Sequence, residues 1–360
     1  MKKILIATGG TGGHIYPALV TGEELKRLGH GVMFIGVLSG SADKLKSQGF
    51  AVKEITAKGF VAKSPWEVVT AFFCLLKAFG DCTGTVLDFK PDVVLGFGGY
   101  SSFPTVFVSW LLGRKTMIHE QNAFPGEANK FLARIVNCVC VGFKDATRFF
   151  PPKKTVWTGI PFRSMGLNIN REEALKKFGL DPLKKTVLVF GGSQGSRRLN
   201  DCVIEVITKF SEKPGFQVVH AAGRKDFLRV REVCGSIKEG YALKEYIENM
   251  DEAYAASDLV VARSGAGTVT ELGILGKLSI MIPYPGAKNH QVYNARVLER
   301  LKMALIIDEK DLSASILRDK ILILLNRNVS QTNVRESLKD EFLPEAVKRL
   351  AGEVVRFTDG

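Results

Sequence analysis

The sequence contains no uninterrupted apolar run of the roughly 18 residues that a membrane-spanning helix requires. A short apolar run follows the two lysines at the start of the chain, but it ends at Gly9-Gly10. That run is too short for the hydrophobic region of a signal peptide. We therefore expect a first β-strand here and a protein that works in the cytosol.

Signatures of metal sites and disulfides are also scarce. No CxxC pair occurs, the histidines do not recur at ligand spacing, and no DxD-type pair of carboxylates is present. We therefore expect no metal and no cofactor. We expect the cysteines to be buried, reduced thiols. They are Cys74, Cys82, Cys138, Cys140, Cys202 and Cys234.

Two common nucleotide-binding fingerprints are missing. The P-loop pattern GxxxxGK[ST] does not occur. The dinucleotide pattern GxGxxG fails because Ile15 stands where a third glycine should follow Gly10 and Gly12. These absences disfavour kinases and ordinary dehydrogenases. They leave a diphosphate ligand that is held in another way, such as a nucleotide sugar.

Positive charge is in excess, since 50 Lys and Arg against 37 Asp and Glu give a net charge of +13. This balance favours an anionic partner, which can be a nucleic acid, a phosphorylated ligand or an anionic membrane surface. The chain has no dense Lys/Arg run and no recognised nucleic-acid-binding motif. We therefore expect no nucleic acid among its partners.

Short apolar runs alternate with longer helical patterns, which is typical of parallel sheets covered by helices on both faces. The expected strands are 4–8, 32–37, 93–97, 116–119, 139–142, 187–190, 218–221, 259–262, 280–283 and 305–308. Residues 2–10 resemble 184–192, and residues 91–99 resemble 257–265. The repeat predicts two doubly wound α/β domains with a boundary near Pro161. Ligands of such domains bind at the carboxyl ends of the strands.

Three glycine-rich loops, 9–14, 191–196 and 265–271, each join an expected strand to an expected helix. Glycine lets backbone N–H groups approach a phosphate. A helix that starts after the loop adds the positive end of its dipole. A single loop of this kind can be a simple tight turn, but three of them in one chain favour phosphate binding.

Several polar side chains near these loops are candidates for chemistry. Glu271 can accept the hydroxyls of a ribose, or it can complement a helix dipole. His14 is a candidate general base, or a helix-start histidine that bonds to the backbone. His119-Glu120-Gln121-Asn122 follows an apolar strand. Because burying four polar residues is costly, we expect this cluster to line an open site.

Basic side chains are also needed if a diphosphate leaves without a metal, because its charge must be stabilised. Arg163 and Arg263 are candidates, although Arg263 can equally anchor the end of its strand. His30 and His220 lie in or beside strand patterns, and we expect both to be structural.

The segment 64–80 is rich in aromatic and aliphatic residues, and Pro65 suits the first turn of a helix. One interpretation is a buried helix. The other is a surface patch that dips into lipid headgroups, with Lys63 and Lys77 beside it. The apolar face of this helix comprises Trp66, Val69, Phe73 and Leu76.

Taken together, the motifs resemble those of the MurG family, the UDP-N-acetylglucosamine:lipid-linked muramoyl-pentapeptide transferases of peptidoglycan synthesis. The motifs lie at 9–14, 98–100, 119–122, 191–195 and 263–266 with Glu271, and the resemblance covers essentially the whole chain. It implies the GT-B fold, with two Rossmann-like doubly wound domains that face a cleft. Residues 1–160 would receive the lipid acceptor on the membrane side, 161–342 would bind the donor, and 343–360 would form a helix that can pack back on the first domain.

The resemblance also implies roles for individual residues of the second domain. Ser193 would contact the diphosphate, Ile247 would contact uracil through its backbone, and Gln291 would lie near the sugar hydroxyls. The helix start would hold the diphosphate and the ribose, with Glu271 on the ribose hydroxyls. The residues of this helix start are Ala266, Gly267, Thr268, Val269, Thr270 and Glu271.

The first domain would supply residues that reach the donor or the reacting centre. By motif these are Thr11, Gly12, Gly13 and Asn122. Arg163 matches the linker arginine of the family. The chain departs from the family pattern in carrying Asn289-His290-Gln291 where members often have two Gln or Asp-His-Gln. It also has Gly267 where some members have Leu.

The implied reaction is an inverting, metal-independent transfer. The 4-hydroxyl of undecaprenyl-pyrophosphoryl-MurNAc-pentapeptide attacks the anomeric carbon of UDP-N-acetylglucosamine, and UDP leaves. His14 is our first choice for the base and Glu120 our second. A lipid acceptor implies a peripheral enzyme on the cytoplasmic face of the anionic inner membrane.

Two other functions fit part of the pattern. A UDP-N-acetylglucosamine epimerase shares the fold and the nucleotide sugar but needs neither a lipid acceptor nor a membrane patch. A non-catalytic nucleotide-sugar-binding protein needs no polar cluster such as His119–Asn122. Consumption of the nucleotide sugar without acceptor would identify the epimerase.

Overall fold

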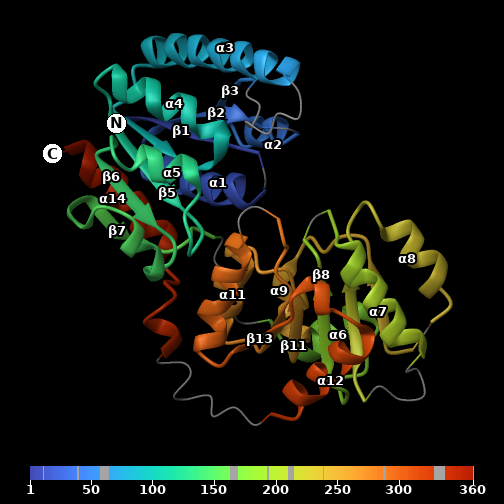
Figure 1. The fold of residues 1–360 in the computed structure, drawn as a ribbon. Coiled ribbons are helices and arrows are strands. Elements are labelled where there is room, and N and C mark those ends of the chain that lie inside the picture. Colours follow the sequence, from blue (N-terminus) through green and yellow to red (C-terminus); the bar gives the residue numbers. More distant parts are fainter. Residues whose placement is uncertain are drawn as a thin grey trace. The chain divides into compact units, whose positions relative to one another are not determined.

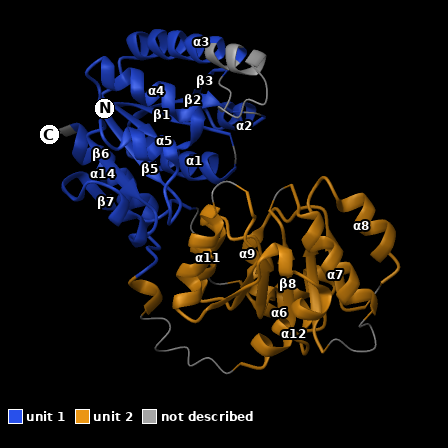
Figure 2. Ribbon diagram, in the orientation of Figure 1, with its two compact units in different colours: residues 1–163, 341–360 blue, residues 164–340 orange. Residues whose placement is uncertain are grey.

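The computed structural model describes residues 1–10, 12–38, 40–56, 65–162, 169–192, 194–209, 215–237, 239–286, 289–327 and 337–359, with the backbone alone for 65–69, 71–72 and 359. The chain divides into two compact units (Figures 1 and 2). Unit 1 comprises residues 1–163 and 341–360, and unit 2 comprises residues 164–340. Each unit is built on one parallel sheet, as the apolar runs predict.

The sheet of unit 1 has the strand order β3-β2-β1-β4-β5-β6-β7, and all its pairs are parallel. Its central strands are apolar on both faces, which suits a sheet covered by helices on both sides. The strands are β1 (Lys3–Gly9), β2 (Gly31–Val37), β3 (Ala51–Glu54), β4 (Val93–Gly96), β5 (Lys115–Glu120), β6 (Cys138–Val141) and β7 (Thr155–Trp157). The helices are α1 (Gly12–Arg27), α2 (Ala42–Ser47), α3 (Pro65–Phe89), α4 (Gly99–Leu111), α5 (Glu127–Leu132) and α14 (Ala346–Asp359), with 3-10 turns η1 (Lys144–Phe149) and η2 (Pro152–Lys154).

The sheet of unit 2 has the order β10-β9-β8-β11-β12-β13, again with parallel pairs only. Its strands are β8 (Thr186–Phe190), β9 (Gln217–Ala221), β10 (Tyr241–Lys244), β11 (Leu259–Ala262), β12 (Ser279–Met281) and β13 (Ala304–Ile306). The helices are α6 (Arg171–Phe178), α7 (Arg197–Lys209), α8 (Phe227–Cys234), α9 (Met250–Ala256), α10 (Ala266–Leu275), α11 (His290–Arg300) and α12 (Ala314–Leu325), with the 3-10 turn η4 (Glu309–Asp311). In both sheets the strand order reverses beside the first strand, which is the position where doubly wound sheets bind ligands.

The C-terminal helix α14 belongs to unit 1, although more than half of the chain separates it from β1. Leu350, Ala351 and Val354 are fully buried in one core cluster with β1 and α1 side chains. Lys2 Nζ donates to the Thr358 carbonyl oxygen at 3.2 Å. The hydrophobic core of unit 1 is therefore completed by α14.

The helix predicted from Pro65 is α3, which continues to Phe89. Its described part has two faces. Ala78, Cys82 and Val86 are buried in the core, whereas Phe73 is 64% exposed and Leu76 is 50% exposed. Trp66 and Val69 have side chains outside the described residues. One face of the helix is therefore buried, as the first interpretation expects, and the other face is exposed.

The six cysteines are free, and five of them are buried, as expected. Cys74, on α3, is the partly exposed one. None of the helices in the described residues is both long enough and apolar enough to cross a membrane.

Candidate functional site

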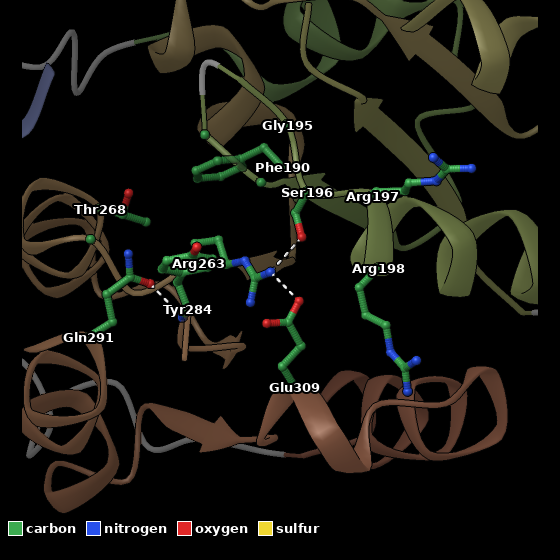
Figure 3. A pocket seen from close by; sticks show the side chains of 13 residues that line it. Phe190, Gly195, Ser196, Arg197, Arg198, Arg263, Thr268, Tyr284, Gln291 and Glu309 are labelled. Carbon is green, nitrogen blue, oxygen red and sulfur yellow. Dashed lines mark hydrogen bonds and ion pairs between the residues drawn. The ribbon is translucent and has the colours of Figure 1, made fainter. Parts of the chain in front are cut away.

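Unit 2 carries a pocket of about 460 Å³ at the carboxyl ends of β8 and β11 (Figure 3). The loops that follow these two strands form it together with the start of α11. The pocket is lined by Phe190, Gly191, Gly192, Gly195, Ser196, Arg197, Arg198, Arg263, Gly265, Thr268, Tyr284, Gln291 and Glu309. Two of the predicted glycine-rich loops therefore meet at one cavity.

Two helix N-termini border this pocket. α7 begins at Arg197 and α10 begins at Ala266, where the N-cap Gly265 provides no side-chain cap. The first N–H groups of a helix have no partner inside the helix and carry the positive end of its dipole. Arg197 and Arg198 lie in the first turn of α7, and the Arg198 guanidinium donates to the Leu312 carbonyl oxygen at 3.2 Å. This combination is suited to a diphosphate.

Backbone segments touch directly under the first of these loops, at Gly195 and Gly223. A Cβ atom on Gly195 would lie 2.3 Å from the Ala222 carbonyl oxygen, and the φ angle of Gly195 is +82°. A Cβ on Gly223 would lie 2.2 Å from the Gly195 Cα. Only glycine fits this approach, so the loop after β8 is held against the loop after β9.

We predict that Gly195→Ala destabilises unit 2 by about 2–4 kcal/mol, because the positive φ alone costs about 1–3 kcal/mol and the contact forces the loops apart. Affinity for a nucleotide sugar should fall as well. Chemical denaturation and calorimetric binding measure the two effects. Gly179→Ala is the control, since Gly179 has φ +68° but open space around its Cβ. Equal losses in the two variants would contradict the close-approach argument.

Arg263 is held in place by contacts within unit 2. Its guanidinium donates to Glu309 Oε1 at 2.6 Å and to Ser196 Oγ at 2.7 Å, as Figure 3 shows. It also donates to the carbonyl oxygens of Ile282 and Pro283. This favours the anchoring interpretation of Arg263 over that of a cation reserved for the ligand.

Glu271 lies in the second turn of α10 and is partly buried. The Tyr254 hydroxyl donates to its Oε2 at 2.7 Å. Burial raises the pKa of Glu271 to about 7, although the hydrogen bond from Tyr254 acts in the opposite direction. A carboxylate held by one partner, with lone pairs left to accept, can bind a pair of hydroxyl groups.

The other predicted residues of unit 2 are distributed around the pocket. Thr268 and Gln291 line it, and Gln291 Oε1 accepts from the Tyr284 backbone N–H at 2.9 Å. Ala266 and Gly267 are partly exposed in the first turn of α10, whereas Val269 and Thr270 have buried side chains. Ile247 is buried just after β10 and is not part of the pocket lining. Ser193 lies outside the described residues.

Unit 1 carries a separate polar cluster at the carboxyl ends of β1 and β5. His14, in the first turn of α1, has its Nδ1 2.9 Å from Gln121 Oε1. Gln121 Nε2 is 3.1 Å from His119 Nδ1, and His119 Nε2 is 2.9 Å from the Gly159 carbonyl oxygen. A continuous hydrogen-bond chain thus runs from the partly exposed His14 into the core.

The expectation that His119–Asn122 lines an open site is wrong for three of its residues. His119, Glu120 and Gln121 are at most 2% exposed. Burial is tolerated because each polar group has a partner, which removes most of the cost of desolvation. Burial lowers the pKa of His119 to about 4, so its ring is neutral near pH 7.

Glu120 accepts hydrogen bonds from the loop that follows β5 and from α5. Its Oε1 accepts from the backbone N–H and the side-chain amide of Asn122 at 2.9 and 3.1 Å. Its Oε2 accepts from Asn129 Nδ2 at 2.8 Å and from the Gly126 N–H at 3.1 Å. Both oxygens of this buried carboxylate are thus taken up by donors and do not face an open site, so the contacts favour our first choice of base over our second.

Of the remaining candidates of unit 1, two lie at the start of α1 and two lie outside the described residues. Gly12 and Gly13 are exposed at the start of α1. Thr11 and Arg163 lie outside the described residues. In unit 2, the buried His220 bonds to Tyr241 and Asn200, and in unit 1 His30 Nδ1 accepts from the Lys2 N–H, so both have structural contacts as predicted.

Some residues of the pocket were not predicted from the sequence. Arg197 and Arg198 follow a glycine-rich loop directly, and that position was a usable signal for anion binding. Glu309 and Tyr284 had no such signal, because they reach the pocket from other elements of unit 2. Within the described residues, no three His, Cys, Asp or Glu side chains gather in a way that could hold a metal ion.

Comparison with known proteins covers nearly the whole chain. Residues 4–141 match the glycosyltransferase family 28 N-terminal domain, and residues 186–350 match the C-terminal domain of that family. A UDP-N-acetylglucosamine--N-acetylmuramyl-(pentapeptide) pyrophosphoryl-undecaprenol N-acetylglucosamine transferase from Acetivibrio thermocellus is 36% identical over 97% of this chain and 96% of its own.

Solved structures agree with this relationship. The crystal structure of Acinetobacter baumannii MurG matches with a TM-score of 0.79 and 26% identity, over 99% of this chain and 100% of its own. CalG4, the calicheamicin glycosyltransferase, matches with a TM-score of 0.74 and 16% identity, over 99% of this chain and 98% of its own. The second likeness concerns the fold alone.

Proposed function

The chain belongs to glycosyltransferase family 28 and has the GT-B fold, and on that premise we propose that it transfers N-acetylglucosamine from UDP-N-acetylglucosamine to undecaprenyl-pyrophosphoryl-MurNAc-pentapeptide. The observation that carries the proposal is the near full-length similarity to transferases with that name. The two polar centres, one in each unit, supply groups that this reaction needs. The enzyme is a hexosyltransferase of peptidoglycan precursor synthesis.

The donor half of the reaction belongs to unit 2. The N-termini of α7 and α10, with Ser193, Arg197 and Arg198, would stabilise the diphosphate as UDP leaves. Glu271 would accept the ribose hydroxyls, Ile247 would contact uracil through its backbone, and Gln291 would contact the sugar. Residues 266–270 would act mainly through their backbone, because the side chains of Val269 and Thr270 are buried.

The acceptor half belongs to unit 1. His14 would take the proton of the attacking 4-hydroxyl, and the loops around Gly12, Gly13 and Asn122 would position the reactants. His14 is preferred over Glu120 because its ring is partly exposed, whereas Glu120 is buried and accepts four hydrogen bonds. Thr11 and Arg163 stay proposals on the strength of the motif alone.

The direct test of the transfer uses UDP-N-acetylglucosamine labelled in its sugar and a synthetic lipid-linked muramoyl-pentapeptide diphosphate. We expect the label to move into the lipid fraction in a new β-linked disaccharide. A label that stays on the nucleotide, or that returns as an epimer without acceptor, would contradict the proposal.

We further propose that the enzyme binds peripherally to the cytoplasmic face of the anionic inner membrane through the exposed face of α3. Phe73 and Leu76 are exposed there, and Lys77 is exposed beside them. Apolar side chains next to a cation suit the boundary between headgroups and acyl chains. The net charge of +13 adds a general attraction to anionic lipid.

We predict that the double variant Phe73→Ser/Leu76→Ser binds anionic vesicles about tenfold more weakly, which corresponds to ~1.4 kcal/mol of lost apolar burial. Vesicle co-sedimentation measures this, and calorimetry with UDP-N-acetylglucosamine should show unchanged donor affinity. The matched control is Leu183→Ser/Leu228→Ser in unit 2, where the two leucines are 93% and 68% exposed. The proposal fails if a folded α3 variant binds vesicles like the control.

A further inference from the structure

The hydrogen-bond chain of unit 1 has a direction, and one backbone carbonyl group fixes it. Gln121 Nε2 lies 3.2 Å from the His119 carbonyl oxygen, which can only accept a hydrogen bond. The amide end that faces this oxygen must therefore be the NH₂ end, because the reverse orientation would place two acceptors together. The other end, Oε1, faces His14 Nδ1 at 2.9 Å. An amide oxygen carries no hydrogen, so the proton between the two atoms belongs to His14 Nδ1.

The hydrogen bonds of His119, at the other end of the hydrogen-bond chain, have the same direction. His119 Nε2 is 2.9 Å from the Gly159 carbonyl oxygen, so Nε2 donates. The ring of His119 is neutral, since burial lowers its pKa to about 4. Its Nδ1 is then an acceptor, and Gln121 Nε2 donates to it at 3.1 Å. Each donor in the chain thus meets an acceptor, and reversing any one group would create a clash.

The turn that contains Gly159 packs against the C-terminal segment of the same unit. A Cβ atom on Gly159 would lie 2.9 Å from the Ala346 Cβ and 3.0 Å from the Leu343 Cβ, so the turn at Gly159 packs tightly against the start of α14. Its φ angle of +77° suits glycine. The C-terminal segment of the protein therefore packs against Gly159, where the series of hydrogen bonds from His14 ends.

We propose that Gln121 is a positioning residue that holds His14 in the Nδ1–H tautomer and so makes His14 Nε2 the atom that accepts the proton. The hydrogen bond at one ring nitrogen sets the role of the other. Gln121 does this as a neutral amide, and His119 and Gly159 in turn hold Gln121. Nε2 lies near the start of α4, since a Cβ on Gly99 would lie 3.5 Å from it.

This inference rests on the proposed function, because it names the atom that acts in the transfer. The acceptor 4-oxygen forms a bond to the anomeric carbon, the bond from that carbon to the UDP oxygen breaks, and the 4-hydroxyl proton moves to His14 Nε2. His14 becomes a cation with a proton on both nitrogens, and Nδ1–H still donates to Gln121 Oε1. A ring that began with its proton on Nε2 would have no lone pair facing the hydroxyl.

The first test is the tautomer itself, which does not depend on activity. Nitrogen-15 and carbon-13 chemical shifts of the His14 ring, assigned by comparison with His14→Ala, distinguish the two neutral forms. At a pH where the ring is neutral, we expect the wild-type chain to show Nδ1–H. In Gln121→Met, which has similar length but no hydrogen-bonding group, we expect Nε2–H to become the main form, as in free imidazole side chains.

The second test is kinetic. Gln121→Met should lower kcat on the order of 10- to 100-fold, part of the 10²–10⁴-fold that a general base supplies, with the KM for UDP-N-acetylglucosamine unchanged. Gln121→Glu keeps an acceptor oxygen for Nδ1–H, but it places its other carboxylate oxygen against the His119 carbonyl oxygen and His119 Nδ1, which are both acceptors, so it should not restore wild-type kcat.

Gln48→Met is the matched control in the same unit. Gln48 lies at the end of α2, and its side-chain oxygen has no hydrogen-bond partner in the structure. Its backbone carbonyl oxygen accepts a hydrogen bond from Lys26 Nζ. Lys26 lies about 18 Å from His14 along α1. We expect wild-type kcat from this variant.

The outcomes separate this inference from the proposed function. An active wild-type enzyme whose His14 carries its proton on Nε2 would overturn the role of Gln121 and leave the transferase intact. An inactive wild-type protein with Nδ1–H on His14 would overturn the proposed transferase function and leave the role of Gln121 in setting the tautomer intact. A Gln121→Met variant with unchanged tautomer and unchanged kcat would also overturn the inference.

Discussion

His14→Ala is expected to lower kcat by about 10²- to 10⁴-fold, the range that a positioned general base contributes. Affinity for UDP-N-acetylglucosamine should change by less than about twofold, because the pocket that we propose for the donor is built from unit 2 and His14 belongs to unit 1. Steady-state release of UDP in the presence of the lipid acceptor measures kcat, and calorimetry measures donor affinity.

His30→Ala is the control for this prediction. It removes an imidazole from the same unit, at the other end of α1, where His30 accepts a hydrogen bond from the Lys2 N–H. We expect kcat near that of the wild type. If His14→Ala retains most of its kcat, the base is another group and the assignment made here is wrong.

Glu271→Gln is expected to weaken binding of UDP-N-acetylglucosamine by about 10- to 100-fold. Hydrogen bonds to a charged acceptor contribute about 1.5–3 kcal/mol, and the amide replaces a charged acceptor of two hydroxyls with a neutral oxygen. Tyr254 can still donate to that oxygen, so the fold should be preserved. Calorimetry measures the loss, and Glu205→Gln, which breaks only an exposed pair with Lys209, should bind the donor normally.

Glu271 also predicts a pH dependence of donor binding. Its pKa is raised to about 7 in the unliganded protein, and the ribose hydroxyls need the ionised form. Affinity should therefore fall as pH decreases below about 7, approaching tenfold per pH unit. The diphosphate of a nucleotide sugar does not titrate in this range. Glu271→Gln should bind equally weakly across it, and a persistent pH dependence in that variant would contradict the assignment.

The parallel sheets were predictable where strands are buried on both faces. All ten expected strands are present, because interior strands such as β1, β4 and β11 read as short apolar runs. The three missed strands are β3, β7 and β10, and each lies at the edge of its sheet. Their side chains are partly exposed, so no apolar run distinguishes them from loops.

The site was predictable at the level of its loops but not of its hydrogen bonds. Glycine-rich turns identified both strand ends that border the pocket of unit 2, because close backbone approach requires glycine. The burial of His119 and Gln121 was not visible, because it depends on partners such as Gly159, which is far away in sequence. For the same reason, the choice between His14 and Glu120 required the atomic contacts.

The measurement that tests the central claim most directly is the release of UDP from UDP-N-acetylglucosamine, with and without the lipid-linked muramoyl-pentapeptide acceptor, in the presence of EDTA. We predict release that depends on the acceptor and survives the chelator. A folded protein that binds UDP-N-acetylglucosamine but releases no UDP when the acceptor is added, or that converts the sugar without it, would contradict the account.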